Sequence, residues 1–217
     1  MAAPYIAVFF GVKMIKKIDG IVLEDEKEEK KAENAAPDPL AEKFLKTRQI
    51  LLSGEICEEL AEKIIRQLLI LEADNDKPIY IYVDSPGGDV YAGFAIFDTI
   101  RFINAPVYII GTGLIASAAA LILLSVPKER RLGLPHSSYL IHQPSSGMKG
   151  VATDIQIHAK EMEKTRAVIN RIIAGQTGKP FEQVEKDTDR DYWIDANEAV
   201  DYGLISRIVT KRSDLKK

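Results

Sequence analysis

The sequence predicts an α/β domain with a largely parallel sheet, and three observations lead to this fold class. Short β-branched and aromatic runs at residues 79–83, 107–110 and 138–141 read as buried strands. Segments of helical periodicity lie between these runs. Gly, Pro or Ser residues border each run, as is usual where a strand gives way to a turn. Such alternation is typical of parallel strands joined by helical crossovers.

The first helices are predicted from apolar residues spaced three and four apart. Residues 55–72 place aliphatic side chains on one face and Glu and Lys on the other, which indicates an amphipathic helix. Residues 89–102 return to the same spacing after the first strand. Residues 117–126 are apolar nearly all round, so we expect a helix buried on every side. The strand at 107–110 is expected to end at Gly111-Thr112-Gly113.

The C-terminal half contains the longest periodic segment, residues 152–174, which should stop at Gly175 or Gly178. Because this helix lies outside the strand alternation, we expect it to project and to pack against another subunit. A short helix over 197–202 and a last strand over 204–209 complete the domain.

Composition excludes several classes of protein. The 217 residues, of 24.1 kDa, are 46% hydrophobic and 28% charged with a net charge of -3, so no basic surface for nucleic acid or anionic lipid is indicated. The single cysteine, Cys57, excludes a disulfide within the chain and a Cys-based metal cluster. No apolar run approaches the roughly 18 residues that cross a bilayer. We expect a soluble, cytoplasmic protein without nucleic-acid or membrane partners.

The N-terminal part differs from the rest. Residues 24–39 are charged and Ala/Pro-punctuated, which predicts a linker. The expected organisation is a flexible tail over 1–40 followed by a domain over 41–217. We favour Met14 as the true start of translation, because it opens a more ordinary stretch of sequence.

Ser117 is the first candidate for chemistry. It follows a glycine-containing turn and opens an alanine-rich helix, where unpaired backbone N–H groups favour developing negative charge. The alternative, favoured by position alone, is that Ser117 is only an N-cap. Gly87 and Gly88 follow a strand at the edge where α/β sheets place ligands, and their backbone freedom suits an oxyanion hole. A simple strand-to-helix turn is the alternative there.

His142 ends a buried strand at the same edge and could exchange a proton with Ser117. A hydrogen-bonded histidine at a strand end is an equally good interpretation. His136 and His158 are expected to be solvated. Several aspartates could orient the imidazole, and spacing does not choose among them: Asp187, Asp189, Asp191 and Asp195.

A competing motif is GTGLIA at residues 111–116, which fits a dinucleotide-binding fingerprint. That fingerprint needs an acidic residue about 20 positions later to hold a ribose. The region contains Glu129 between basic residues in a loop. We therefore discount the match.

Five segments together resemble the Clp protease family, and they cover residues 44–210 in unbroken order: VDSPGGDVYAGFAIFDTIRF, GTGLIASAAALIL, YLIHQPSSG, GVATDIQIHAKE and KDTDRDYWIDANEAVDYGLI. The resemblance implies a serine endopeptidase with Ser117 as nucleophile, His142 as general base and acid, and Asp191 as the orienting carboxylate. It also implies an oxyanion hole from the backbone N–H groups of Gly88 and Ala118. Neither a metal nor a bound cofactor is implied.

The resemblance further implies the fold and the partners. The fold is the one shared by Clp proteases and crotonases, with repeated β-β-α units and a protruding handle helix. The subunits would form two stacked seven-membered rings, and a separate AAA+ unfoldase would use ATP to feed unfolded polypeptides. Because residues 1–43 do not resemble the usual N-terminal segment, rings mixed with a paralogous subunit remain an alternative. A crotonase-like acyl-CoA enzyme and a catalytically silent ring subunit are the other functional alternatives.

Overall fold

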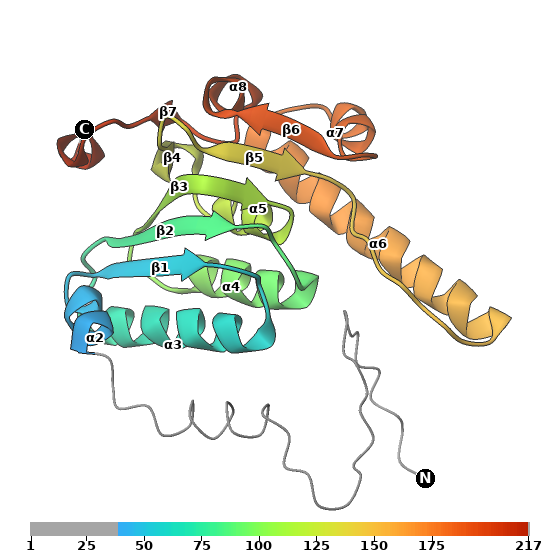
Figure 1. The fold of residues 1–217 in the computed structure, drawn as a ribbon, viewed down its shortest axis with the longest axis horizontal. Coiled ribbons are helices and arrows are strands. Elements are labelled where there is room, and N and C mark those ends of the chain that lie inside the picture. The colour runs from blue at the N-terminus through green and yellow to red at the C-terminus, as the bar shows by residue number, and fades with distance from the viewer. Residues whose placement is uncertain (1–38, 217) are drawn as a thin grey trace, which may run out of the picture. The chain divides into compact units, whose positions relative to one another are not determined.

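A computed structural model of the chain describes residues 39–216 (Figure 1). The predicted linker and tail and the start at Met14 lie outside the described residues, apart from residues 39 and 40, which begin helix α2 (Pro39–Leu45).

The centre of the fold is a seven-stranded sheet. Its strands are β1 (Gln49–Ser53), β2 (Ile79–Ser85), β3 (Val107–Ala116), β4 (Arg131–Gly133), β5 (Ser138–Ile141), β6 (Tyr192–Asp195) and β7 (Arg207–Ile208). The main path runs β1-β2-β3-β4-β7, while β5 pairs with both β3 and β6. Among the strand pairs that the structure describes, β5 with β6 is antiparallel and the others are parallel. The predicted largely parallel α/β fold is confirmed.

Helices cover one face of this sheet, as Figure 1 shows for α3, α4 and α5. The remaining helices are α3 (Glu58–Asp74), α4 (Val90–Phe102), α5 (Ala118–Leu123), α6 (Ala152–Thr177), α7 (Phe181–Asp187) and α8 (Ala196–Tyr202), with 3-10 turns at Lys128–Arg130 and Arg212–Lys216. Side-chain caps explain two of the starting points. The Asp89 carboxylate accepts from the N–H of Ala92 at the start of α4, and Asp195 forms a capping box with Glu198 at the start of α8.

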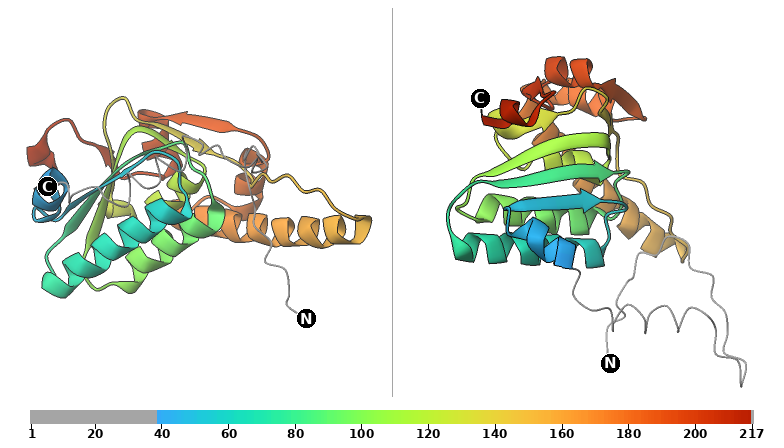
Figure 2. Two further views of the ribbon diagram at one scale, coloured as in Figure 1. Left: turned by 60° about the horizontal axis from the view of Figure 1, so that its bottom comes forward. Right: turned by 60° about the vertical axis from the view of Figure 1, so that its left-hand side comes forward.

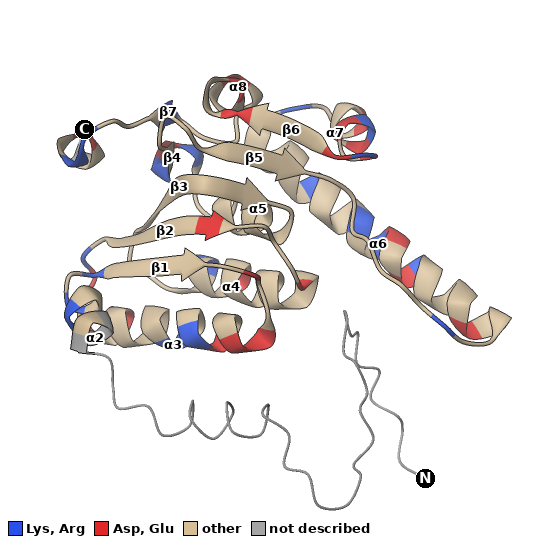
Figure 3. Cartoon of the chain, in the orientation of Figure 1, with Lys and Arg blue, Asp and Glu red and all other residues tan. Residues whose placement is uncertain are grey.

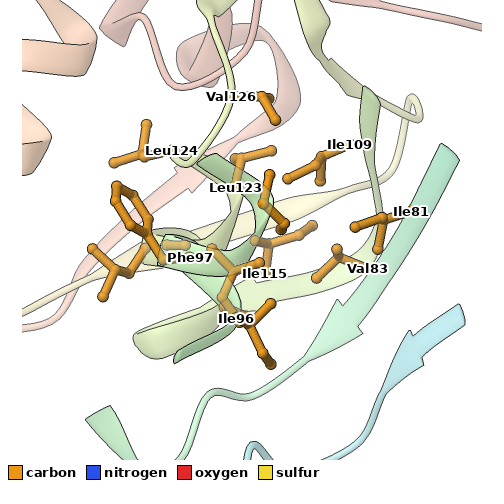
Figure 4. Close-up of a cluster of buried hydrophobic side chains, with 14 of the residues drawn as sticks. Ile81, Val83, Ile96, Phe97, Ile109, Ile115, Leu123, Leu124 and Val126 are labelled. Atoms are coloured by element: carbon orange, nitrogen blue, oxygen red, sulfur yellow. The ribbon is translucent and has the colours of Figure 1, made fainter. Parts of the chain in front are cut away.

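The main core lies between the sheet and these helices (Figure 4). Ile81 and Ile109 from the strands meet Ile96 of α4 and Leu123 of α5, and all four side chains are fully buried. All six residues of α5 are buried, as its sequence predicts. This short helix therefore sits rigidly beneath the residue that precedes it, Ser117.

The end predicted for the strand at residues 107–110 is wrong. Instead of turning at residues 111–113, β3 continues to Ala116. Gly111 pairs with Val83 on one side and with Gly133 on the other, and Gly113 takes a positive φ of +64°. The two glycines thus allow β3 to be an irregular strand, which pairs with β4 in its first part and with β5 in its last part. The dinucleotide-like pattern lies inside this strand rather than at a strand-to-helix turn.

Two smaller expectations also differ from the structure. The last strand covers only Arg207–Ile208, because the N–H groups of Leu204 and Ile205 bond to Ala199 O and close α8 instead. The helix predicted over 152–174 extends to Thr177: Gly175 lies within α6, and the second expected stop, Gly178, ends it in the left-handed conformation with a φ of +77°.

Helix α6 projects from the domain, as the views in Figures 1 and 2 agree. Its N-terminal half is largely exposed, whereas Asn170 and Ile173 near its C-terminal end are buried. Acidic and basic residues are interspersed along it (Figure 3). In the part of the chain described here, neither α6 nor any other helix combines the length and apolarity needed to span a membrane.

Arg48, directly before β1, joins three elements through its guanidinium group. The side chain is largely buried and donates hydrogen bonds to the carbonyl oxygens of Leu71, Asn75, Lys77 and Pro78. These acceptors include Leu71 O in the last turn of α3 and the carbonyl oxygen of Asn75, the C-cap of that helix. Arg48 therefore fixes the end of α3 against the start of β2.

We expect Arg48→Met to lower the thermal unfolding midpoint by roughly 5–10 °C, because it leaves several partly buried carbonyls without donors. Differential scanning calorimetry measures the shift. Arg66→Met is the matched control: Arg66 is 68% exposed and pairs with Glu62 one turn away, so its loss should shift the midpoint by less than about 2 °C. Equal shifts in the two variants would contradict the role given to Arg48.

Candidate active site

Strand β5 brings the first two candidate residues together. Parallel pairing of β3 with β5 places Ala116 beside Leu140, and the Ser117 N–H donates to Leu140 O at 2.9 Å. Ser117 then adopts a φ of +55° and a ψ of -120°, a conformation that non-glycine residues rarely take. Its side chain makes no cap hydrogen bond to α5. Ser117 Oγ lies instead 2.8 Å from His142 Nε2.

The antiparallel pairing of β5 with β6 brings in the carboxylate. The described register ends with Ile141 opposite Tyr192, so one further step places His142 opposite Asp191. His142 Nδ1 lies 3.0 Å from Asp191 Oδ1. The His142 side chain is 25% exposed and that of Asp191 is 62% exposed. A hydroxyl, an imidazole and a carboxylate thus form one continuous chain of contacts.

The other three aspartates hold different partners. Asp195 caps α8, and Asp189 forms an ion pair with Arg166 at 3.2 Å. Asp187 accepts a hydrogen bond from the Tyr202 hydroxyl at 2.8 Å. Burial, and then this carboxylate, raise the pKa of Tyr202 far above its usual range, so the hydroxyl stays a donor. Of the four aspartates that spacing left open, Asp191 is the one that contacts His142.

The Gly87–Gly88 turn lies directly against Ser117. Ile56 N–H donates to Gly87 O, and Asp89 N–H donates to Ile56 O. In a parallel pairing these two bonds turn the N–H of Gly88 to the opposite side, away from Ile56. Within residues 39–216, neither this N–H nor that of Ala118 reaches an acceptor. The turn next to Ser117 and the first residue of α5 therefore each carry an amide donor without a backbone acceptor.

A pocket opens beside these groups. Besides Ser117 and His142, its walls include Val90 of α4, Leu121 of α5, and Ile169 and Ile173 of α6. The sequence interpretation missed all four of these wall residues, because helical spacing marks them only as core positions.

The two remaining histidines lie apart from this chain of contacts. His136 is exposed, as expected. His158 is half-buried and lies 3.1 Å from Ser146 Oγ, so the expectation that it is simply solvated is wrong. Across the described range, no three His, Cys, Asp or Glu side chains gather closely enough to hold a metal ion.

Comparison with known proteins identifies the family. The Clp protease family model matches residues 31–212. ATP-dependent Clp protease proteolytic subunit 2 of Treponema denticola is 63% identical over 87% of this chain and 94% of that relative. The same-named protein of Treponema pallidum is 58% identical over 89% of this chain and 98% of its own. The chain belongs to the Clp protease family. A solved mutant of ClpP1 from Listeria monocytogenes, at 46% identity, superposes with a TM-score of 0.76 and covers 81% of this chain and 99% of its own.

Membership of the Clp protease family makes this chain a serine-type peptidase and a proteolytic subunit of that type. The same membership accounts for the protruding α6 as the handle helix of the Clp protease fold. It favours the peptidase over the crotonase-like alternative.

The Gly87 turn gives a direct test of how this Clp protease site is built. A Cβ at Gly87 would lie 2.6 Å from Ser117 Cβ and 2.7 Å from Ala116 O, at a φ of +94°. We expect Gly87→Ala to lower peptidase kcat/KM at least about 100-fold, because the turn and Ser117 must separate. Gly147→Ala is the control, since a Cβ there meets nothing within 4 Å. Parental kcat/KM in Gly87→Ala would show that the turn does not shape the site.

Proposed function

We propose that the chain is an endopeptidase whose nucleophile is Ser117, whose general base and acid is His142, and whose orienting carboxylate is Asp191. The single observation that supports this most is the continuous chain of contacts from Ser117 Oγ through His142 to Asp191 Oδ1, at 2.8 and 3.0 Å. The distances and the order of the groups are those that acyl transfer by a serine requires.

The reaction follows from the positions of these groups. Ser117 Oγ attacks the peptide carbonyl while His142 Nε2 accepts its proton, and Asp191 accepts the N–H at His142 Nδ1 and stabilises the imidazolium. The N–H groups of Gly88 and Ala118 stabilise the oxyanion, each contributing a factor of about 10²–10³. The imidazolium then gives its proton to the leaving amine. Water repeats the sequence on the acyl-enzyme and releases the second product.

We propose that the substrate is an extended polypeptide added along the Gly88 turn as a further strand. Gly88 uses neither its N–H nor its carbonyl toward Ile56, so the carbonyl can accept from an added strand while the N–H donates to the carbonyl oxygen under attack. The pocket beside Ser117 would then accept the side chain that precedes the scissile bond. Because Val90, Leu121, Ile169 and Ile173 are apolar, we expect apolar side chains there.

The assembly is proposed from exposed apolar residues together with the family. Val151 just before α6, and Ile155 and Ile157 on it, are exposed by 43–66%, and Phe102 at the end of α4 by 82%. Surfaces of this kind are covered in a stable protein, and they suit contacts between and within rings. We propose two stacked heptameric rings in the cytoplasm, homomeric or shared with a paralogous subunit.

The partners follow from the proposed chemistry. An AAA+ unfoldase would supply unfolded polypeptides and use the ATP, while the triad and water complete each hydrolysis. We therefore propose that the chain itself uses no cofactor.

Ser117→Ala should lower kcat on a fluorogenic peptide by about 10⁴–10⁶ and abolish labelling by a fluorophosphonate, because the attacking oxygen is removed. Intact mass after labelling reports the modification, and native mass reports whether the rings persist. Ser146→Ala is the matched control, because Ser146 also contacts a histidine, His158, but does not line the pocket that opens beside Ser117. We expect its activity and labelling to be parental.

Two outcomes would contradict this proposal. Turnover by Ser117→Ala at the parental rate would exclude Ser117 as nucleophile. A parental chain that forms rings yet resists the fluorophosphonate would be a silent ring subunit.

The pocket predicts a preference at the residue preceding the scissile bond. Peptides with Leu or Met there should show at least about tenfold higher kcat/KM than peptides with Asp, because a charge would lose its water in an apolar pocket. Ile169→Ala should reduce kcat/KM for the Leu peptide several-fold more than for an Ala peptide. Val168→Ala is the control, since Val168 is outside the pocket and 39% exposed. Equal use of Leu and Asp peptides would rule the pocket out as the specificity site.

A further inference from the structure

The segment that carries Asp191 is exposed where it meets His142. Asp189, Arg190 and Asp191 are all exposed, whereas Thr188 before them is buried. The strand register that aligns β5 with β6 ends at Ile141 and Tyr192. His142 and Asp191 therefore lie one residue beyond the last described pair, where no ladder hydrogen bond holds them opposite each other.

Gln143 restores the connection immediately after His142. Its backbone N–H donates to Thr188 O at 2.6 Å, and its side-chain Nε2 donates to Asp189 O at 2.6 Å. The same Nε2 lies 3.5 Å from Asp189 Oδ1. The residue next to the base is thus bonded at two points to the segment that ends in the carboxylate.

From this geometry we infer that Gln143 is a positioning residue that holds Asp191 against His142. The inference rests on the proposed roles of these two residues. Backbone bonding alone would leave Asp189, Arg190 and Asp191 anchored at Thr188, whereas the amide of Gln143 moves the anchor one residue closer to Asp191. A shift of about 1 Å in such a carboxylate is enough to lower a rate about 100-fold.

The opposite side of the segment is held independently by α6. Asn170 Oδ1 accepts from Thr188 Oγ1 at 3.0 Å, and Arg166 Nη2 donates to Asp189 Oδ1 at 3.2 Å. These contacts fix the segment against the helix but do not reach β5. Gln143 is therefore the side chain that connects this segment to the end of β5, where His142 lies.

The test uses Gln143→Met, which keeps the length of the side chain and removes the donor, in the full-length chain. We expect kcat to fall about 10- to 100-fold with KM changed less than about twofold, because binding groups are untouched. Gln143→Lys should retain at least about a third of parental kcat, since an ammonium restores a donor to Asp189. Gln183→Met is the matched control: Gln183 also donates to a nearby aspartate, Asp187, but both residues lie on α7, before the segment. Its kcat should be parental.

A double-mutant cycle separates positioning from general stability. In an Asp191→Asn background, Gln143→Met should slow fluorophosphonate labelling of Ser117 by less than about twofold, because the group it positions is already lost. A further loss of the size seen in the parental background would overturn the inference. A kcat within twofold of parental in Gln143→Met would also overturn it.

Trp193 supplies a readout that does not depend on turnover. It is the single tryptophan of the chain, lies two residues after Asp191 and is 56% exposed. Loosening the segment should raise acrylamide quenching of its fluorescence in Gln143→Met and not in Gln183→Met. If the parental chain cleaves nothing, the proposed function fails and this measurement still decides the role of Gln143. If Gln143→Met does not assemble, Gln143→Glu replaces it; loss of assembly in both would make Gln143 a folding residue and overturn the inference.

Discussion

The candidate site depends on the position of one four-residue strand, β5, between two neighbours of opposite direction. Its parallel pairing with β3 sets Ser117 beside the end of the strand, and its antiparallel pairing with β6 sets Asp191 opposite His142. A slip of one residue in either register would turn every side chain of β5 to the other face. The buried Tyr139 and Ile141, which point into the core, oppose such a slip. The packing of the core therefore determines the contacts of the triad.

Much of the fold could be predicted where local signals are strong. Helix α4 has a side-chain cap at Asp89 and α8 ends at a left-handed Gly203, and both appear in the sequence as ordinary boundary residues. The strands β1, β4 and β6 were not predicted. Strand β4 is three residues long, and β6 places exposed aromatic residues, Tyr192 and Trp193, at its start. Each exists because a distant strand pairs with it, which no local pattern records.

For the site too, the local sequence indicated some residues, whereas others depend on contacts between distant parts of the chain. Ser117 and His142 could be proposed from the sequence because Ser117 opens an alanine-rich helix after a glycine-containing turn and His142 directly follows a clear strand. The choice of acid could not be made, since four aspartates lie within nine positions. Three of them have other partners: Asp195 caps α8, Asp187 accepts from the Tyr202 hydroxyl, and Asp189 forms an ion pair with Arg166. The resemblance to a family pointed to Asp191, which spacing could not single out. The antiparallel register of β5 and β6 gives the physical reason, because it places Asp191 opposite His142.

Helix α6 links substrate binding, the carboxylate and the surface that projects from the domain. Ile169 and Ile173 form part of the pocket wall, while Arg166 and Asn170, on the same turns, hold Asp189 and Thr188. The N-terminal half of the helix leaves the domain and exposes apolar residues such as Ile157. The pocket wall and the segment of Asp191 therefore share one support, the C-terminal half of α6, and a change in the packing of this half displaces both.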